Sequence, residues 1–230
     1  MNVCKSLLDW ALPNTCLCCR ERLRHPAKLC RFCLADIERI TFKDSANLLH
    51  RPDINKLLKS PKFDSLFAVT WYQDPTSQWL KALKFNKQLI YINALRQLIK
   101  QQLLAAKRFK NWQQPDVIMP VPLHWLRDFR RGFNQSEEIW QGVNIPIDTH
   151  SLIRTRRTKA QSELNKRDRK SNVRGAFNCN LLTRYQHVAI VDDIITTGNT
   201  VNELARLLKN AGVREVSVWV VAISAQSYRG

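Results

Sequence analysis

Residues 188–200, with the sequence VAIVDDIITTGNT, constrain the fold more than any other segment of this chain. Four apolar residues are followed by the adjacent carboxylates of Asp192 and Asp193, then by a turn rich in hydroxyl groups and glycine, and at once by a helical pattern. A strand that passes through a short turn into a helix is the building unit of α/β domains, in which helices cover a mainly parallel sheet. The segment therefore predicts an α/β domain in which this strand ends at the two acids.

The chain from residue 65 onward repeats the alternation of strand and helix. The last predicted helix begins with Thr200 and Glu203 as a capping-box pair and stops at Gly212. Apolar runs predict strands, and apolar residues at helical spacing predict helices. The predicted strands span residues 65–71, 116–121, 188–191 and 216–222, and the predicted helices span residues 76–84, 89–107, 134–141 and 200–211.

The turn at residues 196–200 has the composition of a phosphate cradle. Backbone N–H groups in such a turn converge, and the dipole of the following helix adds positive potential. Gly198 lets the backbone approach a ligand closely, and the acids upstream can accept hydrogen bonds from a sugar diol. The spacing matches neither a Walker A loop nor a dinucleotide-binding turn. An ordinary capped turn is the alternative, but capping does not require two consecutive acids.

The segment resembles the signature of type I phosphoribosyltransferases, which binds 5-phosphoribosyl-1-pyrophosphate (PRPP). The matching features are an apolar strand, two acids, two spacer residues and the sequence T-T-G-x-T. The resemblance implies that Asp192 and Asp193 are catalytic residues that contact the ribose hydroxyls. It also implies that Mg²⁺ bridges the ribose and the pyrophosphate. The residues implied to hold the 5-phosphate are Thr196, Thr197, Gly198, Asn199 and Thr200.

His124 and Arg131 are further candidates for contact with PRPP. The type I fold has a second loop that touches the pyrophosphate, and we expect it at residues 121–124, after a predicted strand. Arginine can pair bidentately with a phosphate, and Asn134 can cap the next helix. The alternatives are a histidine without a ligand and a solvated arginine.

The chain is strongly basic, with a net charge of +18, which favours polyanionic partners. Residues 154–174 contain nine lysines or arginines and two acids. We interpret this segment as a lid over PRPP, a nucleic-acid patch or a solvated loop. No apolar stretch approaches the length of a membrane helix, and an export signal is not apparent, so we expect a cytoplasmic protein.

Cys16-x-x-Cys19 and Cys30-x-x-Cys33 are two knuckles separated by ten residues. In a reducing compartment this pattern predicts a closed structural Zn²⁺ site with four thiolate ligands. So short a stretch lacks a core of its own, and the metal would supply its stabilisation. Cys18 lies inside the first knuckle and is an alternative ligand. A redox role or a chance grouping is the other interpretation. The predicted organisation is a cysteine module at residues 1–40, a connector at 41–64 and a phosphoribosyltransferase-like domain at 65–230.

The order of these motifs resembles the ComF/GntX family over nearly the whole chain. The shared features are, in order, the two knuckles, Lys84-Phe85, the loop at 121–124, the run at 131–135, the stretch with Thr158 and Gln161, Asn172–Phe177 and the PRPP loop. The resemblance implies a small N-terminal zinc ribbon on a type I phosphoribosyltransferase-like domain. Several members carry additional knuckles, which residues 41–64 lack.

The family is associated with natural competence and DNA utilisation. The resemblance therefore implies a PRPP-binding protein that works with single-stranded DNA or with DNA-processing proteins such as helicase or recombination machinery. The alternative is an active phosphoribosyltransferase that acts on a nucleobase or nucleotide precursor.

Overall fold

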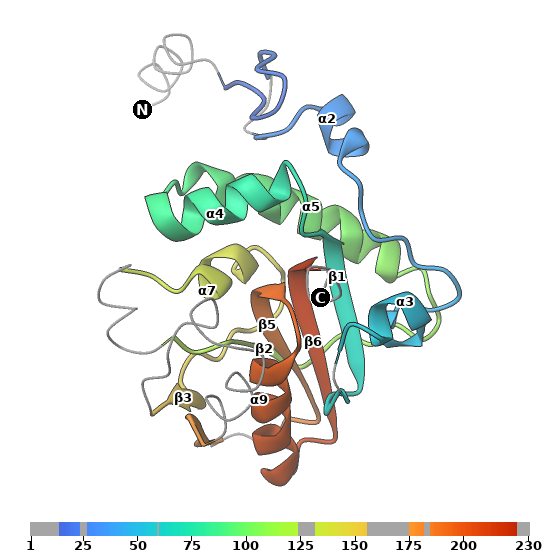
Figure 1. The fold of residues 1–230 in the computed structure, drawn as a ribbon, viewed down its shortest axis with the longest axis vertical. Coiled ribbons are helices and arrows are strands. Elements are labelled where there is room, and N and C mark those ends of the chain that lie inside the picture. Colours follow the sequence, from blue (N-terminus) through green and yellow to red (C-terminus); the bar gives the residue numbers. More distant parts are fainter. Residues whose placement is uncertain are drawn as a thin grey trace.

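The computed structural model describes residues 14–23, 27–58, 60–123, 132–155, 175–181 and 185–224. Its centre is a sheet of four strands in the order β1-β6-β5-β2, and every neighbouring pair is parallel. The strands are β1 (Ser65–Trp71), β2 (Val117–Pro120), β5 (His187–Ile195) and β6 (Glu215–Ile223). The predicted α/β fold with a parallel sheet is confirmed (Figure 1).

Helices cover both faces of the sheet (Figure 1). One face packs against α4 (Thr76–Asn86), α5 (Ile90–Ala106) and α7 (Gln135–Trp140). The other packs against α9 (Asn199–Asn210), η1 (Leu48–His50) and α3 (Pro52–Asn55), and against the antiparallel pair β3 (Leu152–Arg154) and β4 (Phe177–Cys179). Helix α2 (Arg31–Asp36) belongs to the cysteine module. Within the described ranges, no helix has both the length and the apolar character of a membrane span.

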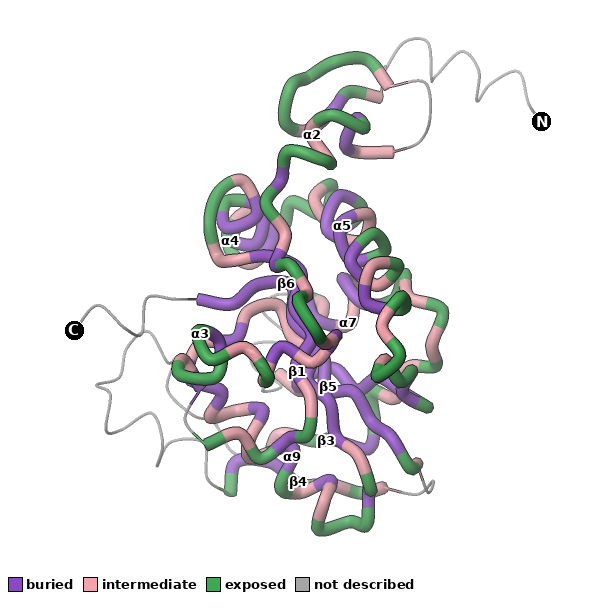
Figure 2. Tube along the Cα trace, turned by 90° about the vertical axis from the view of Figure 1, so that its right-hand side faces the viewer, coloured by how far each residue is buried: buried purple, intermediate pink, exposed green. Residues whose placement is uncertain are grey.

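Strand residues alternate between the two layers of the core. Leu66 and Ile190 lie in the layer that contains α9, whereas Phe67 and Ala189 lie in the layer that contains α4 and α5. Successive side chains of a strand point to opposite faces, so a sheet covered on both sides needs apolar residues at every position. This explains the continuous apolar runs in the sequence, and Figure 2 shows the strands as mostly buried between the helices.

Two details of the predicted strand–turn–helix unit are wrong. Strand β5 does not end at Val191: it continues through both acids to Ile195, because β6 pairs with it along this length, for example Ile194 with Ala222. Helix α9 begins at Asn199, and Gly198 is the N-cap without a side-chain capping bond. Thr200 is therefore inside the first turn and cannot form the predicted capping box. Gly212 follows the helix, as predicted.

Residues of the predicted connector contribute to the core. Leu48, Ile54, Leu58 and Phe63 are buried in the layer that contains α9. The side chain of Asn47 ties this segment to the start of β1, since its Oδ1 accepts a hydrogen bond from the Leu66 N–H at 3.0 Å. The domain limits at residues 40 and 64 stay a prediction, but the segment between them packs with the phosphoribosyltransferase-like part.

Gln102 of α5 joins the last residue of the predicted cysteine module to the sheet from a buried position. Its Nε2 donates to the Ile40 carbonyl at 2.6 Å and to the Ala68 carbonyl at 3.2 Å, and the residue is 3% exposed. We expect Gln102→Leu to lower the free energy of unfolding by about 1–3 kcal/mol, because two buried carbonyls lose their donor. Urea unfolding measures the change, and Gln101→Leu on the exposed side of α5 is the control. Equal stabilities of the two variants would contradict this role.

Candidate functional site

The two acids of the predicted site lie at the carboxyl end of β5, beyond the end of β2. The last paired residues of β2 and β5 are Pro120 and Val191, whereas Asp192 pairs with Val220 of β6. One edge of β5 is thus no longer paired with a strand where the acids begin. In open α/β sheets this is the place where ligands bind, because the connections diverge there.

The predicted phosphate loop follows directly. Thr196, Thr197 and Gly198 form the turn, and Asn199 and Thr200 are the first two residues of α9. Gly198 has φ of 76°, a left-handed conformation that favours glycine, and its carbonyl accepts the first helical bond from the Asn202 N–H at 2.9 Å. The N-terminal N–H groups of a twelve-residue helix therefore open onto the turn. The structure brings the two acids and all five predicted phosphate-binding residues together.

The segment before β1 supports the loop from outside. Leu58 Cδ2 lies 3.5 Å from the position that a Cβ on Gly198 would occupy. The side chain of Asn202 accepts a hydrogen bond from the Lys62 N–H at 2.8 Å. These contacts hold the first turn of α9 next to Leu58 and Lys62, a contribution that sequence patterns did not reveal.

Asp192 is the electrostatically unusual group of the site. Burial and, after it, the negative charge of Asp193 raise its pKa to about 7. The Asp193 N–H, the Ser136 hydroxyl and the Lys84 ammonium act in the opposite direction. Burial, together with the charges of Asp193 and Asp74, also raises the pKa of Tyr72. Asp192 therefore changes charge close to neutral pH, as groups in functional sites often do.

Ser136 and Trp140, both on α7, were missed as site residues in the sequence. The Ser136 hydroxyl donates to Asp192 Oδ1 at 2.9 Å, and Trp140 Nε1 donates to the Asp192 carbonyl at 3.2 Å. Lys84 of α4 was also given no role, although Lys84-Phe85 is one of the motifs that signalled the family. The only signal for Ser136 is its position directly after the run at residues 131–135.

The second predicted loop starts beside the acids. The Val121 N–H donates to the Val191 carbonyl at 2.9 Å, and the Val121 carbonyl accepts from Asn134 Nδ2 at 3.2 Å. Asn134 also caps α7, as predicted, by accepting from the Ser136 N–H at 3.1 Å. His124, Arg131 and the basic segment at residues 156–174 lie outside the described residues, so their roles stay predictions.

The raised pKa of Asp192 predicts a pH-dependent gain in stability for Asp192→Asn. Between the ordinary carboxyl pKa of 3.8 and about 7, the folded protein keeps a proton that the unfolded chain has lost, so stability falls as pH rises through this window. Asparagine removes this cost. We expect the gain to be roughly 1.5 kcal/mol at pH 5 and roughly 4 kcal/mol at pH 8, measured by urea unfolding.

Asp116→Asn is the control for this prediction. Hydrogen bonds from the N–H groups of His187 and Gln186 lower the pKa of Asp116 against a smaller effect of burial. The ionised carboxylate of Asp116 therefore stabilises the folded state. Its replacement by asparagine is expected to destabilise the protein at both pH 5 and pH 8. A gain from Asp192→Asn that is equal at pH 5 and pH 8 would contradict the raised pKa.

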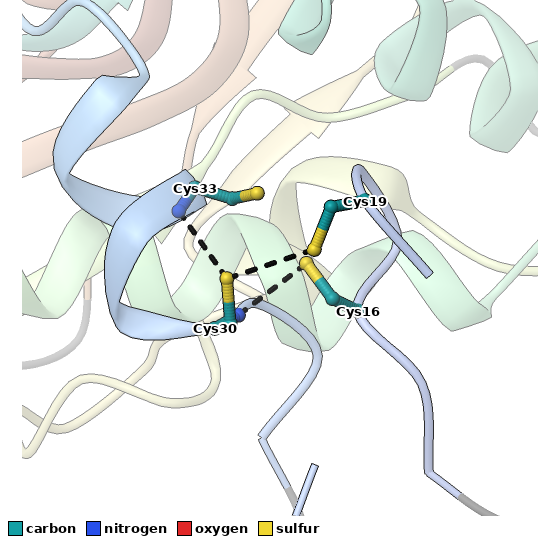
Figure 3. A group of neighbouring side chains, drawn as sticks. All are labelled: Cys16, Cys19, Cys30 and Cys33. Atoms are coloured by element: carbon teal, nitrogen blue, oxygen red, sulfur yellow. Dashed lines mark hydrogen bonds between the residues drawn. The ribbon is translucent and has the colours of Figure 1, made fainter. Parts of the chain in front are cut away.

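The four cysteines of the two knuckles form one cluster. The Sγ atoms of Cys16, Cys19, Cys30 and Cys33 all lie within 4.8 Å of one another. Figure 3 shows Cys30 and Cys33 at the start of α2, facing Cys16 and Cys19 from the preceding loop. This donor set suits a closed structural metal site. Among the described residues, Cys18 is not part of the cluster.

Backbone N–H groups point at the sulfur atoms. The Cys30 N–H donates to Cys16 Sγ at 3.4 Å, and the Cys33 N–H donates to Cys30 Sγ at 3.3 Å. Burial opposes ionisation of Cys16, but the N–H groups of Cys30, Cys19 and Cys18 outweigh it and lower its pKa to about 6. One sulfur is thus already stabilised as the thiolate that metal binding requires.

Known proteins match the domain and up to about three quarters of the chain. The family model described as phosphoribosyl transferase domain matches residues 91–229. DNA utilization protein YhgH of Escherichia coli (strain K12) is 38% identical over 174 residues, which cover 74% of this chain and 77% of that protein. Competence protein F of Haemophilus influenzae is 34% identical over 175 residues, covering 73% and 76%. Competence protein ComFC of Streptococcus pneumoniae is 25% identical over 152 residues, covering 66% and 65%.

The matched residues include the strand, the acids, the loop and the helix of the site. With relatives of this identity and coverage, the resemblance found in the motifs is confirmed. The chain belongs to the phosphoribosyl transferase domain family and, within it, to the ComF/GntX proteins of competence and DNA utilisation.

Proposed function

We propose that this protein binds Mg–PRPP at the carboxyl end of β5 and serves the uptake or use of DNA. The observation that carries the proposal is the juxtaposition of Asp192 and Asp193 with the turn at residues 196–200. Two carboxylates and a set of converging N–H groups, a few residues apart, suit a ligand with a diol at one end and a phosphate at the other.

Each part of the site has a distinct role in this proposal. Asp192 and Asp193 accept hydrogen bonds from the ribose hydroxyls. The turn and the first residues of α9 donate to the 5-phosphate, with the helix dipole adding positive potential. Mg²⁺ accompanies the pyrophosphate and neutralises its charge when PRPP is bound. His124 and Arg131 are proposed to contact the pyrophosphate.

The proposed biological role rests on the relatives and on the charge. Proteins similar to this chain are named for DNA utilisation and competence. The net charge of +18 suits a polyanionic partner. We infer that the partner is single-stranded DNA or a DNA-processing protein such as a helicase or a recombination protein, and that the protein acts in the cytoplasm.

We propose that the metal of the cysteine cluster is Zn²⁺. With Zn–S bonds of about 2.3 Å, a tetrahedral site places its sulfur atoms about 3.8 Å apart. Cys19 Sγ and Cys30 Sγ are 3.8 Å apart. Zinc held by Cys16, Cys19, Cys30 and Cys33 would crosslink the module and perform no chemistry, because four protein ligands leave no open position.

Calorimetric titration of the zinc-loaded protein with PRPP and Mg²⁺ tests the ligand, with ribose 5-phosphate as the comparison. We expect PRPP to bind and ribose 5-phosphate to bind more weakly, since it lacks the pyrophosphate. The absence of any binding would overturn the proposed ligand.

Deletion of the gene in its host tests the biological role. We expect uptake of DNA, or its use as a nutrient, to fall in the deletion strain.

An active transferase is the second candidate. The observation that favours it is Asp192, whose pKa of about 7 lets it exchange a proton at neutral pH, as acid–base catalysis requires. The acceptor, a nucleobase or nucleotide precursor, would attack C1 of the ribose with a lone pair. The C1–O bond would break with its electrons passing to the departing pyrophosphate, and the proton of the acceptor would pass to ionised Asp192. Release of pyrophosphate from PRPP in the presence of candidate acceptors tests this activity.

A further inference from the structure

Helix α7 is held at its start by the segment after β2 and near its end by α5 and β5. At its start, Asn134 joins the helix to the end of β2 by accepting from the Ser136 N–H at 3.1 Å and donating to the Val121 carbonyl at 3.2 Å. Near its end, Arg96 of α5 donates through Nε to the Glu138 carbonyl at 3.1 Å. Trp140 is fully buried and donates to the Asp192 carbonyl. The N-terminal turn of α7 is therefore fixed against the carboxyl end of β5.

Ser136 uses this position to bond the carboxylate of Asp192. It is 5% exposed, and its Oγ lies 2.9 Å from Asp192 Oδ1. The same oxygen accepts the Asp193 N–H at 2.9 Å, so two donors occupy it. Within the described part of the chain, no hydrogen bond to Asp192 Oδ2 is found. The two contacts thus fix the plane of the carboxylate and leave one oxygen for a ligand.

A carboxylate next to a second acid needs such a donor. Burial and the charge of Asp193 both disfavour the ionised form of Asp192, and the Ser136 hydroxyl is the side-chain donor that counteracts them. A hydrogen bond to a charged acceptor is worth roughly twice a neutral one. Ser136 therefore has both a geometric and an electrostatic effect on the group that is proposed to meet the ribose.

We propose that Ser136 is a positioning residue of the PRPP site, which holds Oδ1 of Asp192 so that Oδ2 faces a ribose hydroxyl. The inference rests on the proposed binding of PRPP. Ser136 lies on α7, outside the signature motif, and would be a further determinant of the affinity for Mg–PRPP. Trp140 assists by fixing the backbone of the same residue.

Ser136→Thr and Ser136→Val form the decisive pair. Threonine and valine have nearly the same shape, so any strain at this buried position is common to both, and only threonine keeps the hydroxyl. We expect Ser136→Val to bind Mg–PRPP roughly tenfold or more weakly than Ser136→Thr in calorimetry. Equal affinities of the two variants would overturn the inference. Thermal unfolding of both variants verifies that they fold alike.

A second measurement separates this inference from the proposed function. In protein with ¹³C-labelled aspartate, NMR follows the titration of Asp192 without any ligand. We expect a higher midpoint in Ser136→Val than in Ser136→Thr, because the ionised carboxylate has lost a donor. Identical midpoints would refute the contact. If the midpoints differ but the wild-type protein does not bind PRPP, the proposed ligand fails and the role of Ser136 toward Asp192 stands.

Discussion

The double substitution Asp192→Asn with Asp193→Asn is expected to abolish detectable binding of Mg–PRPP while the protein remains folded. Two charge-assisted hydrogen bonds to the ribose hydroxyls would be lost. Each is worth roughly 1.5–3 kcal/mol, so affinity should fall about a hundredfold to ten-thousandfold. Titration calorimetry of the wild-type and variant proteins measures the loss.

The fold should survive this change for a physical reason. The ionised form of Asp192 is disfavoured by burial and by its neighbour Asp193, so neutral amides relieve repulsion in the folded state. If the double variant loses ligand binding but is at least as stable as the wild-type protein, the two acids serve the ligand and not the fold. Asp53→Asn on α3, which removes one negative charge at an exposed position, is the control for ligand binding. Wild-type affinity in the double variant would exclude these acids as ligand contacts.

Cys30→Ser is expected to release the structural metal and to unfold the cysteine module. Zinc supplies roughly 10–16 kcal/mol of apparent folding energy to small modules of this kind. Cys30 is the N-cap of α2 as well as a member of the cluster, so its replacement removes a ligand at the start of the only described helix of the module. Metal analysis measures the bound zinc, and limited proteolysis measures the order of residues 14–40.

Cys18→Ser is the control for the metal prediction. Cys18 lies next to the ligands in sequence, but among the described residues it is outside the four-sulfur cluster. We expect this variant to retain zinc in full. Undiminished zinc in Cys30→Ser would overturn the ligand assignment, whereas loss of zinc in Cys18→Ser would make Cys18 a ligand.

Unfolding of the module should also weaken the adjoining core. Leu29 is 2% exposed and belongs to the same buried cluster as α4 and α5. Gln97 of α5 donates to the Leu29 carbonyl at 3.3 Å. Figure 2 shows the module next to α4 and α5. A lower thermal midpoint for the whole chain is therefore expected in Cys30→Ser.

Local sequence patterns were sufficient to predict most of the architecture. Apolar runs identified the four strands of the sheet, because a strand buried on both faces is apolar throughout. Helical spacing identified the helices α4, α5, α7 and α9 of the described domain, because burial of one face imposes a period on the sequence. The acids, the turn and α9 are consecutive, so their juxtaposition needs no knowledge of distant contacts. The same holds for each cysteine knuckle, whose two sulfur atoms are three residues apart.

The tertiary structure decided what depends on partners distant in sequence. Pairing with β6 carried β5 past Val191, and the approach of α7 brought Ser136 to Asp192 across 56 positions. Burial and the neighbouring acid then set the pKa of Asp192. No periodicity encodes such contacts, because they arise from the order of strands in the sheet and the packing of helices on it. The sequence by itself indicated the acids and the turn that are proposed to bear the chemistry, and the packing determined how Asp192 is oriented and charged.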